Sequence, residues 1–266
     1  MKKVGFIGVG NMGAAIVRGI LSSPLAKELS VSAYDQDEDK LAQLVSIGVH
    51  AAKGATEIAA ENDYVFLVVK PQNMAQLLED IRKKANREAI YVSIAAGISS
   101  AYIQQALGFD AKVVLVMPNT PFILGEGASA LARTPLVSED AFALVCRIFE
   151  SRGKIAVLDE SQMKEIIAIN GSSPAFIYLF AKAFMSYAAA HGIAQETALP
   201  LFCQTLTGAA KMMTDSGKNI DELIEMVSSK GGTTIAGLSA FYERDLEGIT
   251  REACERCLHR AEELAQ

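Results

Sequence analysis

Glycines recur in a fixed spacing near the start of the chain. The stretch GFIGVGNMGAAI holds Gly8, Gly10 and Gly13 in the pattern G-x-G-x-x-G, directly after an apolar run and at the start of an amphipathic segment. In such a turn the first glycine permits a tight bend, the second lets the backbone approach a pyrophosphate, and the third lets a helix pack on a strand. Free N–H groups at the helix start would then bind phosphates. A glycine-rich turn without a ligand is the alternative.

An acidic cluster follows the second apolar run. Asp35, in SAYDQDEDK, stands where a carboxylate would bind the adenosine ribose hydroxyls of a dinucleotide. Asp37, Glu38 and Asp39 add negative charge, opposed only by Lys40, and would repel a 2′-phosphate. The local charge therefore favours NADH over NADPH. Alternatively, Asp35 only caps the next helix, a role that Asp37 could serve equally well.

Three later stretches end apolar runs with residues suited to the same crevice. FLVVKPQN carries Lys70, which could contact a ligand or equally well be a surface lysine. VSIAAGIS carries small residues that would admit a flat ring. MPNTP carries Asn119 in a rigid turn, whose role could also be structural only. The predicted cofactor-binding residues are Gly8, Gly10, Asn11, Met12, Gly13, Asp35, Val69, Lys70, Pro71, Gln72, Ala95, Gly97 and Asn119.

These positions require a doubly wound α/β sheet. Apolar runs rich in β-branched residues alternate with helical patterns, the runs at 4–9, 31–34, 64–69, 89–94 and 112–117 and the helices near 12–22, 37–47, 72–84 and 99–106. Continuous rather than alternating runs are typical of parallel strands covered on both faces. EGASALAR and GKIAVL complete the sheet near residue 158. We predict a Rossmann-type parallel sheet over residues 1–158.

The pattern of the remaining sequence predicts helices only. Helices are predicted at 161–170, 173–190, 196–213, 220–226, 233–243 and 246–264, which makes residues 159–266 an all-α domain. The long apolar region 166–194 contains Asn170, Pro174, Lys182 and His191, too many interruptions for a membrane span. We predict a helix buried on nearly all faces, in a core or in a subunit interface.

Composition excludes several classes of protein. Among 266 residues, 50% are hydrophobic and the net charge is −6 with no basic run, which argues against nucleic acid and anionic membranes as partners. The opening residues lack a signal-peptide cleavage pattern. Cys254 and Cys257 have no second cysteine or histidine pair to complete a zinc site, so no metal is expected. We read them as buried helical cysteines and expect a reducing, cytoplasmic location.

The stretch SSKGGTTIAG, residues 228–237, opens a helical pattern with a glycine pair, although glycine is poor helix material. Together with GVGNMG, VKPQ, AAG, MPNTP and GSSPAF, in this order and spacing, it resembles the pyrroline-5-carboxylate reductase family over almost the full length. The resemblance implies NADH- or NADPH-dependent reduction of 1-pyrroline-5-carboxylate to L-proline. It also implies a Rossmann domain followed by a helical dimerisation domain, in a homodimer that often assembles into decamers.

The resemblance places the substrate carboxylate at GGTT. Glycines let successive N–H groups converge at a helix start, threonine hydroxyls add donors, and the helix dipole favours an anion. A plain helix N-cap is the alternative. Thr234 is predicted to be catalytic through a hydrogen bond to the ring nitrogen, and the predicted substrate-binding residues are Gly231, Gly232, Thr233, Thr234 and Asn119. Holding a protonated imine against the nicotinamide needs no triad, and His50, His191 and His259 are expected in structural or surface roles.

The chain departs from the family pattern at three positions. Lys230 stands in place of a proline, Ser173 in place of a glycine, and Met226 in place of an asparagine or arginine. These changes leave open a paralogue with a related imine substrate, or a nucleotide-binding regulator without turnover. A β-hydroxyacid dehydrogenase-like enzyme is a further alternative, but Lys164 has the wrong spacing for its proton-donating lysine and GGTT would be unexplained.

Overall fold

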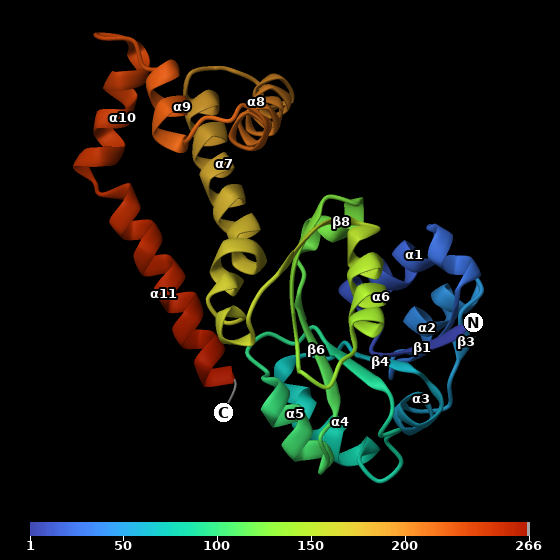
Figure 1. The fold of residues 1–266 in the computed structure, drawn as a ribbon. Helices are drawn as coiled ribbons and strands as arrows, with labels where there is room; N and C mark the ends of the chain where they lie inside the picture. The colour runs from blue at the N-terminus through green and yellow to red at the C-terminus, as the bar shows by residue number, and fades with distance from the viewer. Residues whose placement is uncertain (265–266) are drawn as a thin grey trace. The chain divides into compact units, whose positions relative to one another are not determined.

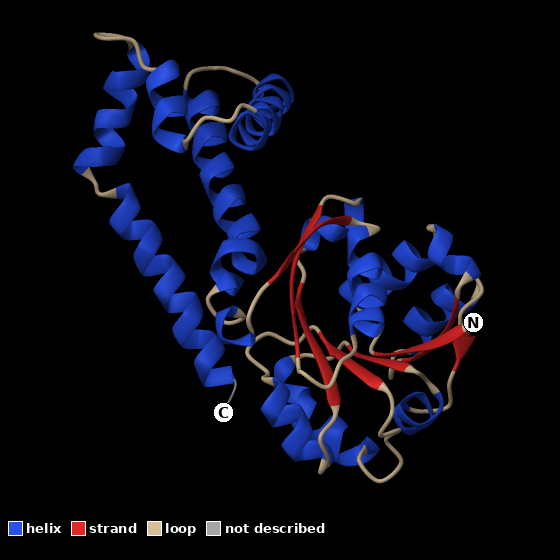
Figure 2. Ribbon diagram, in the orientation of Figure 1, coloured by secondary structure: helices blue, strands red, loops and turns tan. Residues whose placement is uncertain are grey.

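An eight-stranded sheet forms the centre of the first half of the chain in the computed structural model, which describes residues 1–264 (Figures 1 and 2). The order of its strands is β3-β2-β1-β4-β5-β6-β7-β8. The strands are β1 (Lys2–Ile7), β2 (Leu29–Tyr34), β3 (His50–Ala51), β4 (Tyr64–Leu67), β5 (Ile90–Ser93), β6 (Lys112–Met117), β7 (Gly127–Arg133) and β8 (Gly153–Val157). The predicted Rossmann-type sheet is confirmed, and its strand order reverses between β1 and β4.

The direction of β7 differs from the prediction of a wholly parallel sheet. β7 runs antiparallel to β6, with Met117 opposite Ala130, whereas its other neighbour β8 is parallel to it. The connection between β6 and β7 spans only residues 118–126 and holds the 3₁₀ turn η3 (Thr120–Leu124). A parallel crossover needs about a dozen residues or more, so this short connection returns the chain antiparallel.

Helices cover both faces of the sheet (Figure 1). The apolar core on one face includes side chains of α1 (Asn11–Leu21), α2 (Glu38–Val45) and α6 (Glu139–Glu150). The core on the other face includes those of α3 (Ala55–Glu61), α4 (Met74–Ile81) and α5 (Ser100–Leu107). Burial on both faces explains why the strands are continuously apolar.

Two of these helices were not predicted from the sequence. α3 is short, with only two buried residues, Ile58 and Ala59. α6 carries clear helical signals, since Phe142, Val145 and Phe149 have the spacing of one helix face and Ser138 caps the first turn through the Ala141 N–H. The signals for α6 were therefore present in the sequence between the two glycine-bearing strands β7 and β8.

The remaining helices match the predicted ranges closely. They are α7 (Ser173–Ala190), α8 (Gln195–Asp215), α9 (Ile220–Met226), α10 (Thr233–Glu243) and α11 (Leu246–Leu264). The helix predicted at 161–170 is instead a 3₁₀ turn, η4 (Glu160–Gln162), followed by a π-helical turn, η5 (Ile167–Ser172). The chain forms two compact units, one of residues 1–172 with residues 254–264 and the other of Ser173–Ala253. The division at residues 158 and 159 stays a prediction.

The apolar helix α7 is not buried within the chain. In α7 only Pro174 and Ala188 are buried, whereas Tyr178, Leu179 and Tyr187 are more than half exposed. The prediction of a helix buried in a core of this chain is therefore wrong, and the subunit interface is the remaining interpretation. Among residues 1–264, no helix combines the length and apolar character needed to cross a membrane.

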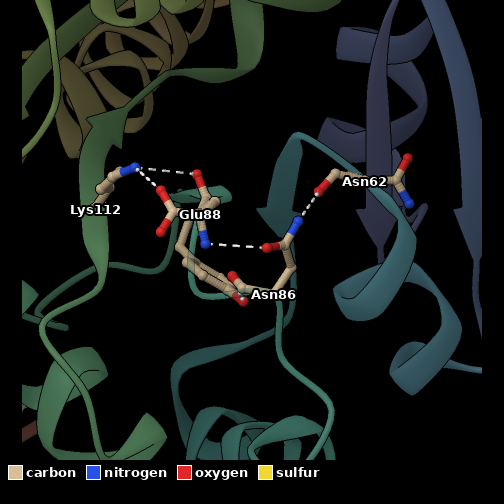
Figure 3. Close-up of polar contacts among 5 residues, drawn as sticks. Asn62, Asn86, Glu88 and Lys112 are labelled. Carbon is tan, nitrogen blue, oxygen red and sulfur yellow. Dashed lines mark hydrogen bonds and ion pairs between the residues drawn. The ribbon is translucent and has the colours of Figure 1, made fainter.

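A polar network lies at the amino ends of the central strands (Figure 3), whereas the glycine-rich loop follows the carboxyl end of β1. The Lys112 ammonium contacts the Glu88 carboxylate at 2.7 Å, the Glu88 N–H donates to Asn86 Oδ1, and the Asn86 amide donates to the Asn62 carbonyl. The Tyr91 hydroxyl donates to the Asn86 carbonyl at 2.9 Å. This network joins the loops before β4 and β5 to the first residue of β6.

Tyr91→Phe is expected to lower the free energy of unfolding by about 1 kcal/mol, because the Asn86 carbonyl loses one of its two donors and keeps only the Ala89 N–H. Chemical denaturation followed by circular dichroism measures the change. Tyr102→Phe is the matched control, since the half-buried Tyr102 packs against the same core and its hydroxyl makes no hydrogen bond within residues 1–264. An equal loss in both variants would show that the Tyr91 hydroxyl contributes nothing specific.

Candidate dinucleotide and carboxylate sites

The glycine-rich turn lies between β1 and α1, beside the point where the strand order reverses. The Gly8 N–H donates to the Tyr34 carbonyl of β2, and the Val68 N–H beyond β4 donates to the Ile7 carbonyl. Gly8 has φ +97°, and a Cβ there would lie 2.3 Å from the Val68 carbonyl oxygen. Only glycine fits this position, so the loop is held against the ends of both neighbouring strands.

The other two glycines of the motif have different surroundings. A Cβ on Gly13 would lie 2.5 Å from the Gly8 carbonyl oxygen, so this glycine permits the close packing of α1 on the loop. Around Gly10, in contrast, no atom lies within 4 Å of the position that a Cβ would take. Gly10 is the N-cap of α1, which has no side-chain cap and no acidic residue in its first turn. This open, uncapped helix start fits a pyrophosphate.

Asp35 follows β2 and points its carboxylate at the same loop. Its Oδ2 accepts the Val9 N–H at 2.6 Å and its Oδ1 accepts the Asp37 N–H at 2.9 Å. The N-cap of α2 is Asp37, whose side chain accepts the Lys40 N–H, so the alternative that Asp35 caps this helix is wrong. A carboxylate oxygen has two lone pairs, which leaves Asp35 able to accept ribose hydroxyls while it holds the loop.

The charge around Asp35 stays negative. The Lys40 ammonium pairs with the Asp37 carboxylate at 2.7 Å. The hydrogen bond from the Lys40 side chain holds the pKa of the Asp37 carboxyl below its usual range, so this carboxylate is ionised at neutral pH. Lys40 is thereby engaged by its own helix, while Glu38 and Asp39 lie in the first turn of α2 and add to the negative charge.

The residues predicted beyond β4 form the next rim of the crevice. Val69 is half-buried, and Lys70 and Gln72 are exposed. Lys70 is the N-cap of the 3₁₀ turn η2 (Pro71–Asn73), which leads into α4. Because Val68 lies within contact distance of the Cβ positions of both Gly8 and Gly13, this rim is packed directly against the glycine-rich turn.

The end of β5 packs against the C-terminal helix. A Cβ on Gly97, which has φ +80°, would lie 2.4 Å from the Ala261 carbonyl oxygen of α11. The approach of α11 is thus a reason for glycine at position 97 that local sequence could not reveal. A small cavity lies between the ends of β5 and β6, lined by Ser93, Ala95, Gly97, Met117, Met163 and Lys164. The Glu160 carboxylate, also at this cavity, accepts the Ser100 N–H and hydroxyl.

Asn119, predicted for both cofactor and substrate, follows β6 and is only 9% exposed. Its Oδ1 accepts the Ala128 N–H at 2.9 Å, and its carbonyl accepts the Phe122 N–H. The side chain therefore has a structural role in the turn. Its position at the carboxyl edge of the sheet is the one predicted.

The GGTT residues start helix α10. Gly231 has φ +74°, Gly232 is the N-cap, and the Gly232 N–H donates to the Ser229 carbonyl at 2.9 Å, so the chain bends sharply into the helix. Thr233 and Thr234 are exposed in the first turn, which has no side-chain cap and no acidic residue. The N–H groups of such a turn lack helical partners and favour an anion. Lys230 is exposed beside them.

The predicted site residues thus fall into two groups. Residues 8–13, Asp35, residues 69–72, Ala95, Gly97 and Asn119 lie together at the carboxyl edge of the sheet, all in the first compact unit. The four residues 231–234 lie in the second unit, at the start of α10. No role was predicted for Asn170, whose amide donates to the Met117 carbonyl of β6 and the Ala128 carbonyl of β7, and whose only signal was a polar residue in an apolar run.

Cysteines and histidines lie outside both groups. Cys254 and Cys257 are half-buried free thiols, less enclosed than the buried cysteines predicted. His191 contacts the Tyr187 carbonyl one turn earlier in α7, and His259 lies 3.5 Å from Glu262 in α11. In the described part of the chain, no cluster of three or more His, Cys, Asp or Glu side chains could hold a metal ion.

The chain is similar to known proteins over its full length. A model of the pyrroline-5-carboxylate reductase dimerisation region matches residues 160–264, and a model described as coenzyme F420-dependent NADP oxidoreductase matches residues 3–97. Pyrroline-5-carboxylate reductase of Escherichia coli is 34% identical over 100% of this chain and 99% of its own. The Arabidopsis thaliana enzyme of that name is 34% identical over 99% and 96%.

A solved structure of a protein with a similar name also resembles this chain over its full length. The NADP-bound pyrroline carboxylate reductase of Plasmodium falciparum superposes with a TM-score of 0.88 at 25% identity, covering 100% of this chain and 98% of its own. The glycine-rich turn and the GGTT helix start thus lie in a chain that is similar to these reductases over its full length. The chain belongs to the pyrroline-5-carboxylate reductase family.

Proposed function

We propose that the protein reduces 1-pyrroline-5-carboxylate to L-proline, the last step of proline biosynthesis, with NADH or NADPH. Full-length similarity to reductases of that name supports the reaction. The observation that carries the substrate class is the start of α10, where two exposed threonines and unpaired N–H groups stand without a cap or an acidic residue. A small acid with hydrogen-bond acceptors is the ligand that this surface suits.

The residues of the sheet edge would hold the cofactor. The pyrophosphate would take the open space at Gly10 and the first turn of α1, and Asp35 would accept the ribose hydroxyls. The bound nicotinamide supplies the hydride. Residues 95–97 and Asn119 would shape the position of its ring at the ends of β5 and β6.

The GGTT residues would bind and orient the imine. The Thr233 and Thr234 N–H groups and the Thr233 hydroxyl would bind the substrate carboxylate, with Gly232 as the N-cap beside it, and the Thr234 hydroxyl would hydrogen-bond the ring nitrogen. A protonated cyclic imine is already electrophilic, so orientation in near-attack geometry provides most of the rate enhancement. No side chain of the protein has to form a covalent bond.

We also propose a cytoplasmic homodimer built by residues 159–266, with residues 1–158 as the cofactor domain; a decamer would require further contacts between dimers. The match of a dimerisation model to residues 160–264 supports this division. The apolar surface of α7 supports a partner subunit, because Tyr178, Leu179 and Tyr187 are exposed in the single chain.

An absorbance assay at the nicotinamide band tests the reaction. Purified protein would receive NADH or NADPH with cyclic imines that carry or lack a carboxylate. We expect turnover of pyrroline-5-carboxylate, and much slower turnover of 1-pyrroline. Cofactor binding without turnover of any imine would identify a regulator, and preference for another cyclic imine would identify a paralogue.

Asp35→Ser is expected to shift the ratio of kcat/KM values for NADPH and NADH about tenfold towards NADPH, since a unit like charge near 4 Å costs about 1–4 kcal/mol. Because serine is shorter and has one oxygen in place of the two that accept the Val9 and Asp37 N–H groups, both cofactors should bind more weakly. Asp35→Asn is the matched variant that keeps one acceptor and removes the charge. An unchanged ratio in both variants would limit Asp35 to holding the loop.

A further inference from the structure

The buried side chain of Asn170 joins three elements near the cofactor edge. Asn170 lies in the π-helical turn η5 and is only 9% exposed. Its amide nitrogen donates to the Met117 carbonyl at 2.7 Å, at the end of β6, and to the Ala128 carbonyl at 3.1 Å, at the start of β7. One side chain therefore bonds the backbone of both antiparallel strands where they separate.

The backbone pairing between β6 and β7 stops at this point, so side chains have to provide the next hydrogen bonds. The last opposed pair is Met117 with Ala130, so the same register would set Asn119 opposite Ala128. Pro118 intervenes and has no N–H to donate. Asn119 Oδ1 accepts the Ala128 N–H instead, and the Asn170 amide donates to the Ala128 carbonyl. The side chains of Asn119 and Asn170 thus satisfy the Ala128 N–H and carbonyl in place of backbone pairing with β6.

The orientation of the Asn170 amide is fixed by these contacts. Both of its N–H groups are used, and a flipped amide would set its oxygen against two carbonyl oxygens. The Oδ1 that results is buried and has no hydrogen-bond partner within residues 1–264. A buried acceptor without a partner carries a free-energy cost, and such groups are kept where a specific geometry is required.

The segment held in this way borders the proposed nicotinamide position. Met117 lines the cavity that also includes Ala95 and Gly97. A Cβ on Gly171 would lie 3.3 Å from the Met117 sulfur, so the residue after Asn170 packs against the same methionine. Asn170 and Gly171 therefore hold Met117 by its backbone and by its side chain.

We propose that Asn170 is a positioning residue for the reduction: it holds residues 117–119 in the geometry that hydride transfer requires. Asn170 itself is assigned no contact with cofactor or substrate. The inference rests on the proposed function for its kinetic consequence, and on hydrogen bonds within the first compact unit for its structural part. Because π-helical turns inside helical segments frequently occur at functional sites, the location of Asn170 agrees with this role.

The test compares Asn170→Ala and Asn170→Asp with Asn62→Ala and Asn62→Asp. Asn62 is a matched control, since it is buried and its amide donates to the Ile58 carbonyl at 2.9 Å, near the amino ends of the strands (Figure 3). For the Asn170 variants we expect kcat to fall about tenfold or more while the Kd of NADH changes less than about twofold, since small misplacements are costly. For the Asn62 variants we expect lower denaturation midpoints with unchanged kcat and KM.

Hydrogen–deuterium exchange gives a second readout that is independent of turnover. Peptides covering residues 117–130 should lose protection in Asn170→Ala and keep it in Asn62→Ala. Unchanged protection, or a kcat equal to that of the wild type despite lost protection, would overturn the positioning role. If the wild-type protein reduces no imine although Asn170→Ala loses protection, the proposed function fails while the structural part of the inference stands.

Discussion

Gly10→Ala is expected to weaken NADH and NADPH binding about 10–100-fold, the usual effect of one methyl group in a filled pocket. The methyl group would occupy the open space at the start of α1, where a pyrophosphate is proposed to lie. Stability should fall by no more than about 1 kcal/mol, because φ −61° suits alanine and only the N-cap preference is lost. The substitution is therefore expected to lower cofactor affinity strongly and the free energy of unfolding only slightly.

Isothermal titration with each cofactor and chemical denaturation measure the two effects. Gly54→Ala is the matched control, since Gly54 is also an N-cap without a side-chain cap and no atom lies within 4 Å of the place that its new methyl group would take. It should lose the same stability and keep wild-type cofactor affinity. Gly8→Ala should instead unfold more easily, because its Cβ meets the Val68 carbonyl. Full cofactor affinity in Gly10→Ala would contradict the proposed pyrophosphate position.

Thr234→Val is expected to lower kcat/KM for the imine about 10–100-fold, through a higher KM and a lower kcat, as for a lost hydrogen bond to a charged group. Valine keeps the shape of threonine and removes the hydroxyl proposed to contact the ring nitrogen. Affinity for NADH and NADPH should stay close to that of the wild type, because none of the predicted cofactor residues belongs to α10.

Steady-state kinetics with varied imine, and titration of the cofactor, separate these effects. Thr214→Val is the matched control: Thr214 is exposed near the end of α8, and its hydroxyl donates to the Ala210 carbonyl one turn earlier. This variant should leave kcat and KM unchanged. Wild-type kinetics in Thr234→Val would remove Thr234 from the site, whereas equal losses in both variants would indicate a general effect on the helical unit.

Local patterns predicted most elements of the fold. The ranges of α7, α9, α10 and α11 match because their apolar spacing, the Asn219 cap of α9 and the glycine boundaries act within a few residues. The central parallel strands were equally readable, since burial on both faces demands continuous apolar runs. α6 was not predicted, although the Ser138 cap and the apolar spacing of Phe142, Val145 and Phe149 are equally local signals.

The direction of β7 was a different kind of error. It depends on the length of the 118–126 connection and on pairing with β6, neither of which is an apolar pattern. The burial of α7 was also beyond local reasoning, because an apolar helix has the same sequence signature in a core and in a subunit interface.

The sequence by itself determined the dinucleotide fingerprint, the GGTT helix start and the acidic residue after β2, because glycine spacing and helix N-termini are local chemistry. Only the tertiary structure decided that Asp35 holds the Val9 N–H, that Gly97 admits the backbone of Ala261, and that Asn170 bonds Met117 across 53 positions. Such contacts join segments far apart in the chain, and their geometry arises only when the sheet has assembled and its neighbours have packed against it.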